Sequence, residues 1–290
     1  MDRHELLSRI SVFPLIARRL ADDMLSGDFR SVFKGQGIEF DEVRRYEPGD
    51  DSRSIDWNVS ARLGAPFVKL YREERELNVF IVFDGSASMD SGGGPATRRE
   101  QAILASALIA LSAERAGERI GAVLFDGEVQ RVFPPRKGRS HAMAVVEAVL
   151  DFRPAVKGSA LGKAIAGAGR ALKRRSLVAV VSDFLCVDWE RELGVLARRH
   201  DVVALRIVDP VDFDLPDAGL VALRDPETEV ELLAPTGFSS FRSAWNDWHG
   251  ERSAAWRAAC ARRKVAGLEL STADDPALAL AGFFGSRRRA

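Results

Sequence analysis

An acid followed by two hydroxyl residues stands directly after an apolar run near residue 80. The run ends at Phe83, and Asp84 comes next. Ser86 and Ser88 then follow Asp84 at alternate positions. A carboxylate in such a place can be a nucleophile, a metal ligand or the cap of the next helix. Which of these three roles Asp84 has must be decided from other residues of the sequence.

Two further polar groups stand where they could join Asp84. Asp183 ends the apolar run 177–181 after Ser182, and Ser159 follows Gly158 just ahead of an expected helix. The carboxyl ends of parallel strands form the binding crevice of an open α/β sheet, so we expect these side chains to converge. They offer carboxylates and hydroxyls without a histidine or thiol, which favours Mg²⁺, Mn²⁺ or Ca²⁺ over zinc or copper.

The elements that must position these residues can be read from the alternation of apolar runs and amphipathic segments. Strands are expected at 78–83, 120–125, 177–181, 202–208 and 268–271, and helices at 99–115, 141–150, 161–174, 190–199 and 241–264. Hairpins are expected where 129–133 follows the second strand and where 221–223 meets 230–232. The pattern predicts an α/β fold with a doubly wound, mainly parallel sheet and helices on both faces.

The first 77 residues follow a different pattern and are expected to form a helix with an antiparallel β extension. Residues 78–285 are assigned to the α/β domain, and 286–290 to a basic tail. The polar string RRYEPGDDSRSIDW has a structural and a functional interpretation. In the first, Asp50, Asp51 and Asp56 pair with arginines and Trp57 anchors a strand to the main domain. In the second, the segment binds a partner.

Bulk composition sets limits on the class of protein. The chain has 290 residues, of which 46% are hydrophobic, so it can bury a substantial core. Lys and Arg total 42 and so do Asp and Glu, which argues against a nucleic-acid partner. Its 2 cysteines have no metal-binding spacing. We see no signal peptide or transmembrane segment and expect a cytoplasmic protein.

The pattern D-x-S-x-S, with a later hydroxyl and a later aspartate, resembles the metal-ion-dependent adhesion site of von Willebrand factor A-like domains. The resemblance carries over to Asp84, Ser86, Ser88, Ser159 and Asp183. It implies that the first two serines bind the ion directly, that Ser159 joins in some states, and that the aspartates act mostly through water. Ser159 stands where that family usually has threonine. Gly85 is unusually small and is expected to loosen the turn.

The upstream string R-x-Y-x-P-G-D-D-x-R-x-I-D-W resembles the bacterial domain-of-unknown-function family 58, and the similarity runs from about Gly35 to the end of the chain. That family often stands beside MoxR-type AAA+ ATPases. The resemblance implies a non-enzymatic adaptor or co-chaperone that binds a partner's acidic residue through the ion.

Four alternatives use residues of this cluster or its neighbours. GSALGKA lacks the spacing of a phosphate-binding loop and has Ala164 where a hydroxyl is needed. A phosphatase with Asp84 as nucleophile would want a second carboxylate at position 86, where Ser86 stands. A metal-assisted hydrolase or phosphatase using the whole cluster stays open as the alternative function, as does a purely structural role without an ion.

Overall fold

The computed structural model describes residues 3–26, 39–48, 50–51, 54–72 and 77–287. The chain divides into two compact units. The larger comprises Met1–Phe29 and Leu77–Ala290, and the smaller comprises Arg30–Glu76.

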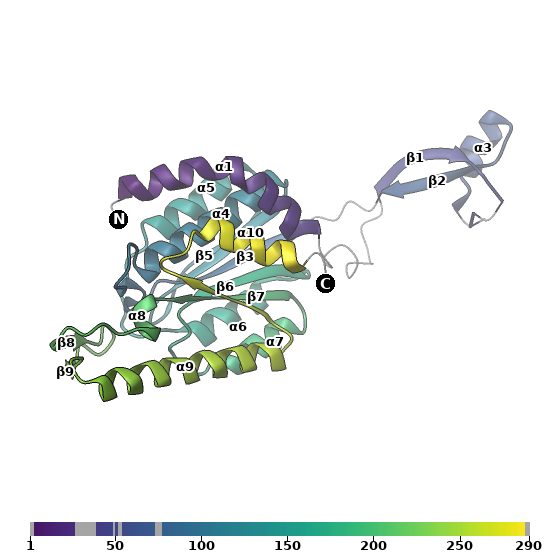
Figure 1. Ribbon diagram of the computed structural model, residues 1–290. Coiled ribbons are helices and arrows are strands. Elements are labelled where there is room, and N and C mark those ends of the chain that lie inside the picture. Colours follow the sequence, from purple (N-terminus) through teal and green to yellow (C-terminus); the bar gives the residue numbers. More distant parts are fainter. Residues whose placement is uncertain (1–2, 27–38, 49, 52–53, 73–76, 288–290) are drawn as a thin grey trace. The chain divides into compact units, whose positions relative to one another are not determined.

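The larger unit is built on a six-stranded sheet with the order β10-β7-β6-β3-β4-β5 (Figure 1). Its strands are β3 Asn78–Asp84, β4 Arg119–Phe125, β5 Val129–Arg136, β6 Ser176–Ser182, β7 Asp201–Val208 and β10 Ala266–Ser271. All neighbouring strands are parallel except β5, which returns antiparallel to β4. Four of them, β3, β4, β6 and β7, are buried almost throughout, which explains their continuous apolar runs.

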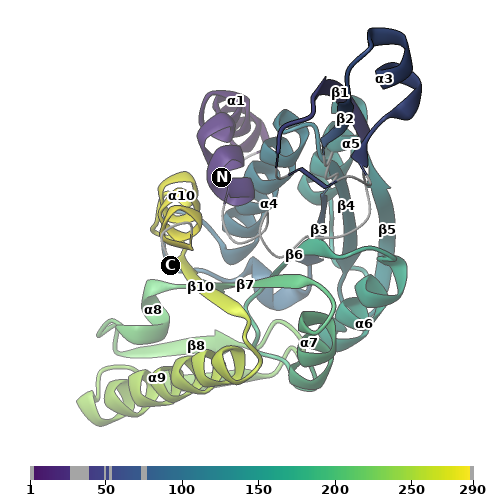
Figure 2. The same cartoon turned by 90° about the vertical axis from the view of Figure 1, so that its right-hand side faces the viewer.

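Helices cover both faces of this sheet (Figures 1 and 2). One face carries α1 Arg3–Ser26, α4 Arg98–Arg115, α5 Arg139–Leu150 and α10 Pro276–Arg287, and the other carries α6 Leu161–Ala171, α7 Glu190–Ala197 and α9 Ser239–Arg262. The expected α/β class and mainly parallel sheet are therefore confirmed. The short helices η2 Ala87–Asp90 and α8 Pro210–Phe213, and the whole of α10, were not expected from the sequence.

A two-stranded hairpin lies outside the main sheet. It consists of β8 Leu220–Arg224 and β9 Glu231–Pro235, which pair antiparallel. Figure 1 shows it at the end of the sheet where β7 runs into α8, which is the end formed by the carboxyl termini of the parallel strands. We call the residues between its strands, 225–230, the hairpin tip.

The division of the chain into domains differs from the expected one at both ends. Helix α1 belongs to the larger unit because Leu6, Ile10 and Leu20 are buried where it packs against α4 and α10. Helix α10 runs to Arg287, whose guanidinium donates to Asp201, so residues 286 and 287 are part of a helix rather than a tail. Residues 288–290 lie outside the described residues.

The smaller unit pairs β1 Glu39–Arg45 with β2 Phe67–Arg72 and includes the short helix α3 Trp57–Leu63. Asp50 pairs with an arginine as the structural interpretation expects, and the partner is Arg44, with two nitrogen–oxygen contacts of 2.8 and 2.7 Å. Asp56 caps α3 by accepting from the amides of its first turn. Trp57 begins α3 with its side chain 70% exposed, and its role as an anchor to the main domain stays a prediction. Gly49 and Arg53 of the same string lie outside the described residues.

No helix in the described part of the chain is long and apolar enough to cross a membrane.

Candidate functional site

The five residues expected to converge lie on three loops at the carboxyl end of the sheet. Asp84 ends β3, and Ser86 and Ser88 follow it in the segment 84–88. Asp183 follows β6, which is paired in parallel register with β3. Ser159 lies ahead of α6 and its hydroxyl donates to Asp84 over 3.2 Å. We call 84–88, 155–160 and 182–185 the three ligand loops.

Asp84 is the buried centre of this cluster. Its side chain is 0% exposed. One carboxylate oxygen accepts from the amide of Ser86 at 2.9 Å, and the other accepts from the hydroxyl of Ser182 at 2.7 Å and from Ser159. Burial, followed by the negative charge of Asp183, raises the pKa of Asp84 from 3.8 to about 7. A positive charge in this place would restore the ionised form at neutral pH.

Asp183 supplies a carboxylate oxygen that its surroundings leave without a partner. Its Oδ1 accepts from the amide of Leu185 at 3.0 Å. Its Oδ2 is buried and has no hydrogen-bond donor among the residues that the structure describes. The nearby guanidinium of Arg206 donates instead to the Asp183 main-chain carbonyl and to Glu269. A buried carboxylate oxygen without a donor is costly, and a bound cation would satisfy it.

The two serines after Asp84 point their hydroxyls at one another. Their Oγ atoms lie 3.2 Å apart, and Ser86 is fully buried while Ser88 is half-buried. Gly85 between Asp84 and Ser86 has a different reason from the one expected. A Cβ at this position would lie 2.2 Å from the ring of Phe152, so the glycine is required by packing rather than by slack in the turn.

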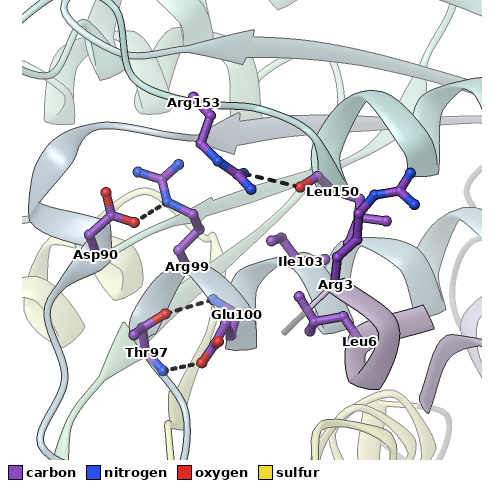
Figure 3. Close-up of a pocket in the computed structure, with 9 residues that line it drawn as sticks. All are labelled: Arg3, Leu6, Asp90, Thr97, Arg99, Glu100, Ile103, Leu150 and Arg153. Carbon is purple, nitrogen blue, oxygen red and sulfur yellow. Dashed lines mark hydrogen bonds and ion pairs between the residues drawn. The ribbon is translucent and has the colours of Figure 1, made fainter. Parts of the chain in front are cut away.

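Arg99 fixes the loop 84–88 through hydrogen bonds to its main-chain carbonyls. Its Nη2 donates to the carbonyls of Gly85 and Ser86 at 3.0 Å each, and its Nε donates to Asp90. Figure 3 shows the same guanidinium lining a small pocket together with Arg153 and Arg3. Because the two carbonyls face a fixed cation, the segment that carries the serines is held in one conformation.

Asp126 positions the loop that carries Ser159, and sequence reasoning missed it. It directly follows β4, the strand beside β3, and its carboxylate accepts from the amides of Glu128, Ala155 and Val156 and from Gln130. These hydrogen bonds hold the pKa of Asp126 below its usual value despite burial. The signal that could have found it is the run IGAVLF, which ends at an aspartate in the same way.

Glu227 is a second residue that the sequence did not single out. It lies on the hairpin tip, and its carboxylate accepts from the amide of Ser88 at 3.0 Å and from the amide of Gly158 at 2.5 Å. It therefore joins two of the three ligand loops. No local motif marks it, because both partners are remote along the chain.

Cys186 brings a thiol to the edge of the cluster, beside Ser159. Burial raises the pKa of this thiol to about 12, and the charges of Asp84 and Asp183 act in the same direction. A thiol that stays protonated at neutral pH is neither a good nucleophile nor a soft metal ligand. The cluster thus keeps the oxygen character expected from its sequence.

The donor set fits a hard divalent cation. Two buried carboxylates stand beside hydroxyls, and one carboxylate oxygen has no donor in the described part of the chain. The described residues contain no group of three or more His, Cys, Asp or Glu placed to hold an ion. An ion here would therefore depend on serine hydroxyls for part of its shell, as Mg²⁺ with its retained waters can.

Gly162 of the GSALGKA segment is required by helix packing. A Cβ there would lie 2.6 Å from the carbonyl oxygen of Asp188, so α6 approaches that backbone closely. The amide of Gly158, which a phosphate-binding loop would offer to a phosphate, is bonded to Glu227.

Comparison with known proteins places most of the chain in one group of sequences. Residues 42–255 match the family described as "Protein of unknown function DUF58". An uncharacterized protein of Mycobacterium tuberculosis strain H37Rv is 34% identical over 297 residues, covering 100% of this chain and 92% of the relative. The uncharacterized protein YeaD of Bacillus subtilis is 28% identical over 99 residues, which cover 34% of this chain and 23% of YeaD.

Among solved structures, the chain is similar to the conserved hypothetical protein BatB of Bacteroides thetaiotaomicron. The two share 16% identity with a TM-score of 0.49, over 74% of this chain and 100% of the other. An aerotolerance-related membrane protein of Bacteroides fragilis gives 16% identity and a TM-score of 0.48, over 74% and 100% of the two chains.

Proposed function

The chain belongs to the DUF58 family, and within it we propose a non-enzymatic, metal-dependent protein-interaction module with a von Willebrand factor A-like domain. The observation that carries the proposal is the pair of buried carboxylates at the ends of β3 and β6. Asp84 has a raised pKa beside Asp183, and Asp183 keeps an oxygen without a donor in the described part of the chain. This arrangement favours a cation.

Each residue has a role in holding that ion. The hydroxyls of Ser86 and Ser88 would bind it directly, with Ser159 as a third hydroxyl. Asp84 and Asp183 would supply the negative charge, acting mostly through water. When bound, Mg²⁺, or Mn²⁺ or Ca²⁺ in its place, supplies a Lewis-acidic position that accepts an oxygen ligand from outside.

The outside ligand in this proposal is a glutamate or aspartate of a protein partner. Ligation by a single carboxylate makes the complex depend on both ion and partner, which suits a switchable adaptor. We propose a MoxR-type AAA+ ATPase as the partner and the cytoplasm as the compartment. Both come from the resemblance in the sequence, so the experiment must identify the partner independently.

A metal-assisted hydrolase or phosphatase is the alternative, and the pKa of Asp84 near 7 is the value that a general base would need. Two observations favour the interaction module. Asp84 is 0% exposed with both oxygens accepting hydrogen bonds, so a substrate cannot reach it without displacing Ser159 or Ser182. The thiol of Cys186 stays protonated. Turnover of phosphate esters with Mg²⁺ or Mn²⁺, abolished in Asp84→Asn, would support the enzyme instead.

Capture of partners from a lysate of the native cells tests the proposal. The expected result is a protein that is retained in Mg²⁺, released in EDTA and not captured by Asp84→Ala. Glu231→Ala, a change on the exposed side of the hairpin, should capture it as the unmodified chain does. Retention that is indifferent to EDTA and to Asp84→Ala would contradict the proposal.

A further inference from the structure

Two main-chain amides on separate ligand loops hold one carboxylate between them. The amide of Ser88 donates to Oε1 of Glu227 at 3.0 Å, and the amide of Gly158 donates to Oε2 at 2.5 Å. Each carboxylate oxygen has its own donor, which is a bidentate arrangement made by backbone rather than by arginine. The donors are separated from Glu227 by 139 and 69 residues, so the contact is a product of the fold.

The two amides belong to residues that flank the proposed ion site. Ser88 itself carries one of its hydroxyls, and Gly158 immediately precedes Ser159. The position is therefore beside the place where a partner's carboxylate would approach the ion. The unpartnered oxygen of Asp183 lies on the third loop of the same cluster.

The hairpin tip is built to present Glu227. Asp225 accepts from the amides of Glu227 and Thr228 at 2.9 and 3.3 Å, and the amide of Glu229 donates back to the Asp225 carbonyl at 2.8 Å. Glu229 adopts a φ of 62°, a strained value for a residue with a side chain. Its carboxylate pairs with Lys157 at 2.8 Å. The tip thus contacts the Ser159 loop through both Glu227 and Glu229.

The attachment of this tip is polar and partly open to water. Glu227 is half-buried, and both members of the Lys157–Glu229 pair are more than half exposed. Ion pairs exposed to this extent contribute little to stability. Of these polar contacts, the two hydrogen bonds of Glu227 therefore contribute most to fixing the tip on the ligand loops. The carboxylate of an external ligand could accept the same two hydrogen bonds in place of Glu227.

We infer that the Ser88 and Gly158 amides form a carboxylate receptor and that Glu227 occupies it as an internal ligand. A partner's acidic side chain binds by displacing the hairpin tip, so the interaction site is self-inhibited. The inference rests on the proposed function for the identity of the partner group. It adds the receptor, the competing residue and the segment that must move. An internal competitor lowers the apparent affinity for the external ligand by the fraction of time that the receptor is free.

Acetate is the probe that tests the receptor without knowledge of the partner. Amide signals of Ser88 and Gly158 are followed by NMR as acetate is added to the full chain, with and without Mg²⁺. In Glu227→Ala we expect saturable shifts of both signals, with an apparent affinity at least about tenfold higher than in the unmodified chain. Glu231→Ala removes an exposed carboxylate of the same hairpin and should behave as the unmodified chain does.

Two results would overturn the inference. One is the absence of any acetate response in folded Glu227→Ala, and the other is an equal response in that variant and in the unmodified chain. Glu227→Gln, which keeps the size of the side chain, is measured alongside and should also admit acetate, so that failure of one variant to fold still leaves a test.

Titration with Mg²⁺ alone on the same samples distinguishes the metal site from the carboxylate receptor. Ion binding without acetate binding in the Glu227 variants would refute the receptor and leave the metal site standing. Acetate binding without ion binding would support the receptor and refute the proposed metal-dependent function.

Discussion

Two neighbouring strands of the sheet end in aspartates that serve opposite purposes. Asp84 ends β3, and Asp126 follows β4, with which β3 is paired in parallel register. Both side chains are 0% exposed. The carboxylate of Asp126 is satisfied by three amides and one side-chain amide, and its pKa is lowered. Asp84 lies beside a second carboxylate and its pKa is raised.

The difference lies in the donors that surround each carboxylate. Donors on the main chain hold a carboxylate ionised and fix a loop, which makes Asp126 a positioning residue for Ser159. Hydroxyls can rotate and can turn their lone pairs toward a cation, which leaves the cluster around Asp84 able to exchange its proton for an ion. Burial alone therefore does not identify a binding site, whereas the kind of donor does.

The largest expected effect comes from removing the positioning aspartate. Asp126→Ala leaves four donors without their acceptor, and we expect a loss of about 3–4 kcal/mol in the free energy of unfolding. Urea denaturation in EDTA measures it. Asp84→Asn under the same conditions at pH 8 should leave stability unchanged or raised, because it removes a buried charge. Equal destabilisation by both changes would erase the distinction between the two aspartates.

The pH dependence of the metal-free protein should separate the same residues. Because the pKa of Asp84 is raised on folding, its contribution is fully present below about pH 4 and is lost as pH rises through about 7, by about 4 kcal/mol. The contribution of Asp126 has the opposite sign. Its lowered pKa gives stability that is present above about pH 4 and is lost as pH falls further.

Comparison with Asp84→Asn isolates this effect from that of the buried histidines. His200 and His249 have lowered pKa values, so they favour the folded state as pH rises through their ordinary range. The quantity to read is the difference in free energy of unfolding between the unmodified chain and Asp84→Asn from pH 4 to pH 8. A difference that stays constant across this range would show that Asp84 is not forced toward its protonated form.

Gly85→Ala tests whether packing fixes the loop between Asp84 and Ser86. The added Cβ would meet the Phe152 ring at 2.2 Å, and we expect a loss of about 2 kcal/mol in stability. In Gly85→Ala with Phe152→Leu the loss should be partly recovered, because the smaller side chain makes room. Thermal and urea unfolding of the two variants give the answer, and full tolerance of Gly85→Ala alone would contradict the packing account.

A smaller effect is expected from removing one hydroxyl of the cluster. Ser88→Ala should weaken Mg²⁺ binding by about tenfold, or about 1.4 kcal/mol, with little change in the stability of the metal-free protein. Ser106→Ala is the matched control, because Ser106 is a buried serine on α4 outside the ligand loops. Calorimetric titration compares the two, and equal ion affinity in both variants would remove Ser88 from the ligand set.

The fold and the centre of the site were open to prediction because their signals are local. Apolar runs that end at Asp84 and Asp183 predicted both the parallel strands and the convergence of their ends. Glu227 was missed because both of its partners are remote along the chain and no motif marks it. Asp126 was missed although an apolar run precedes it, because its contacts with the amides of Ala155 and Val156 are remote along the chain.

Direct titration of EDTA-treated protein with Mg²⁺ at pH 8, repeated with Mn²⁺, tests the central claim most directly. The account predicts one ion per chain, loss of binding in Asp84→Ala and in Asp183→Ala, and unchanged binding in Glu231→Ala. Absence of binding by either ion in the folded, unmodified chain would contradict it, and so would binding that survives in both aspartate variants.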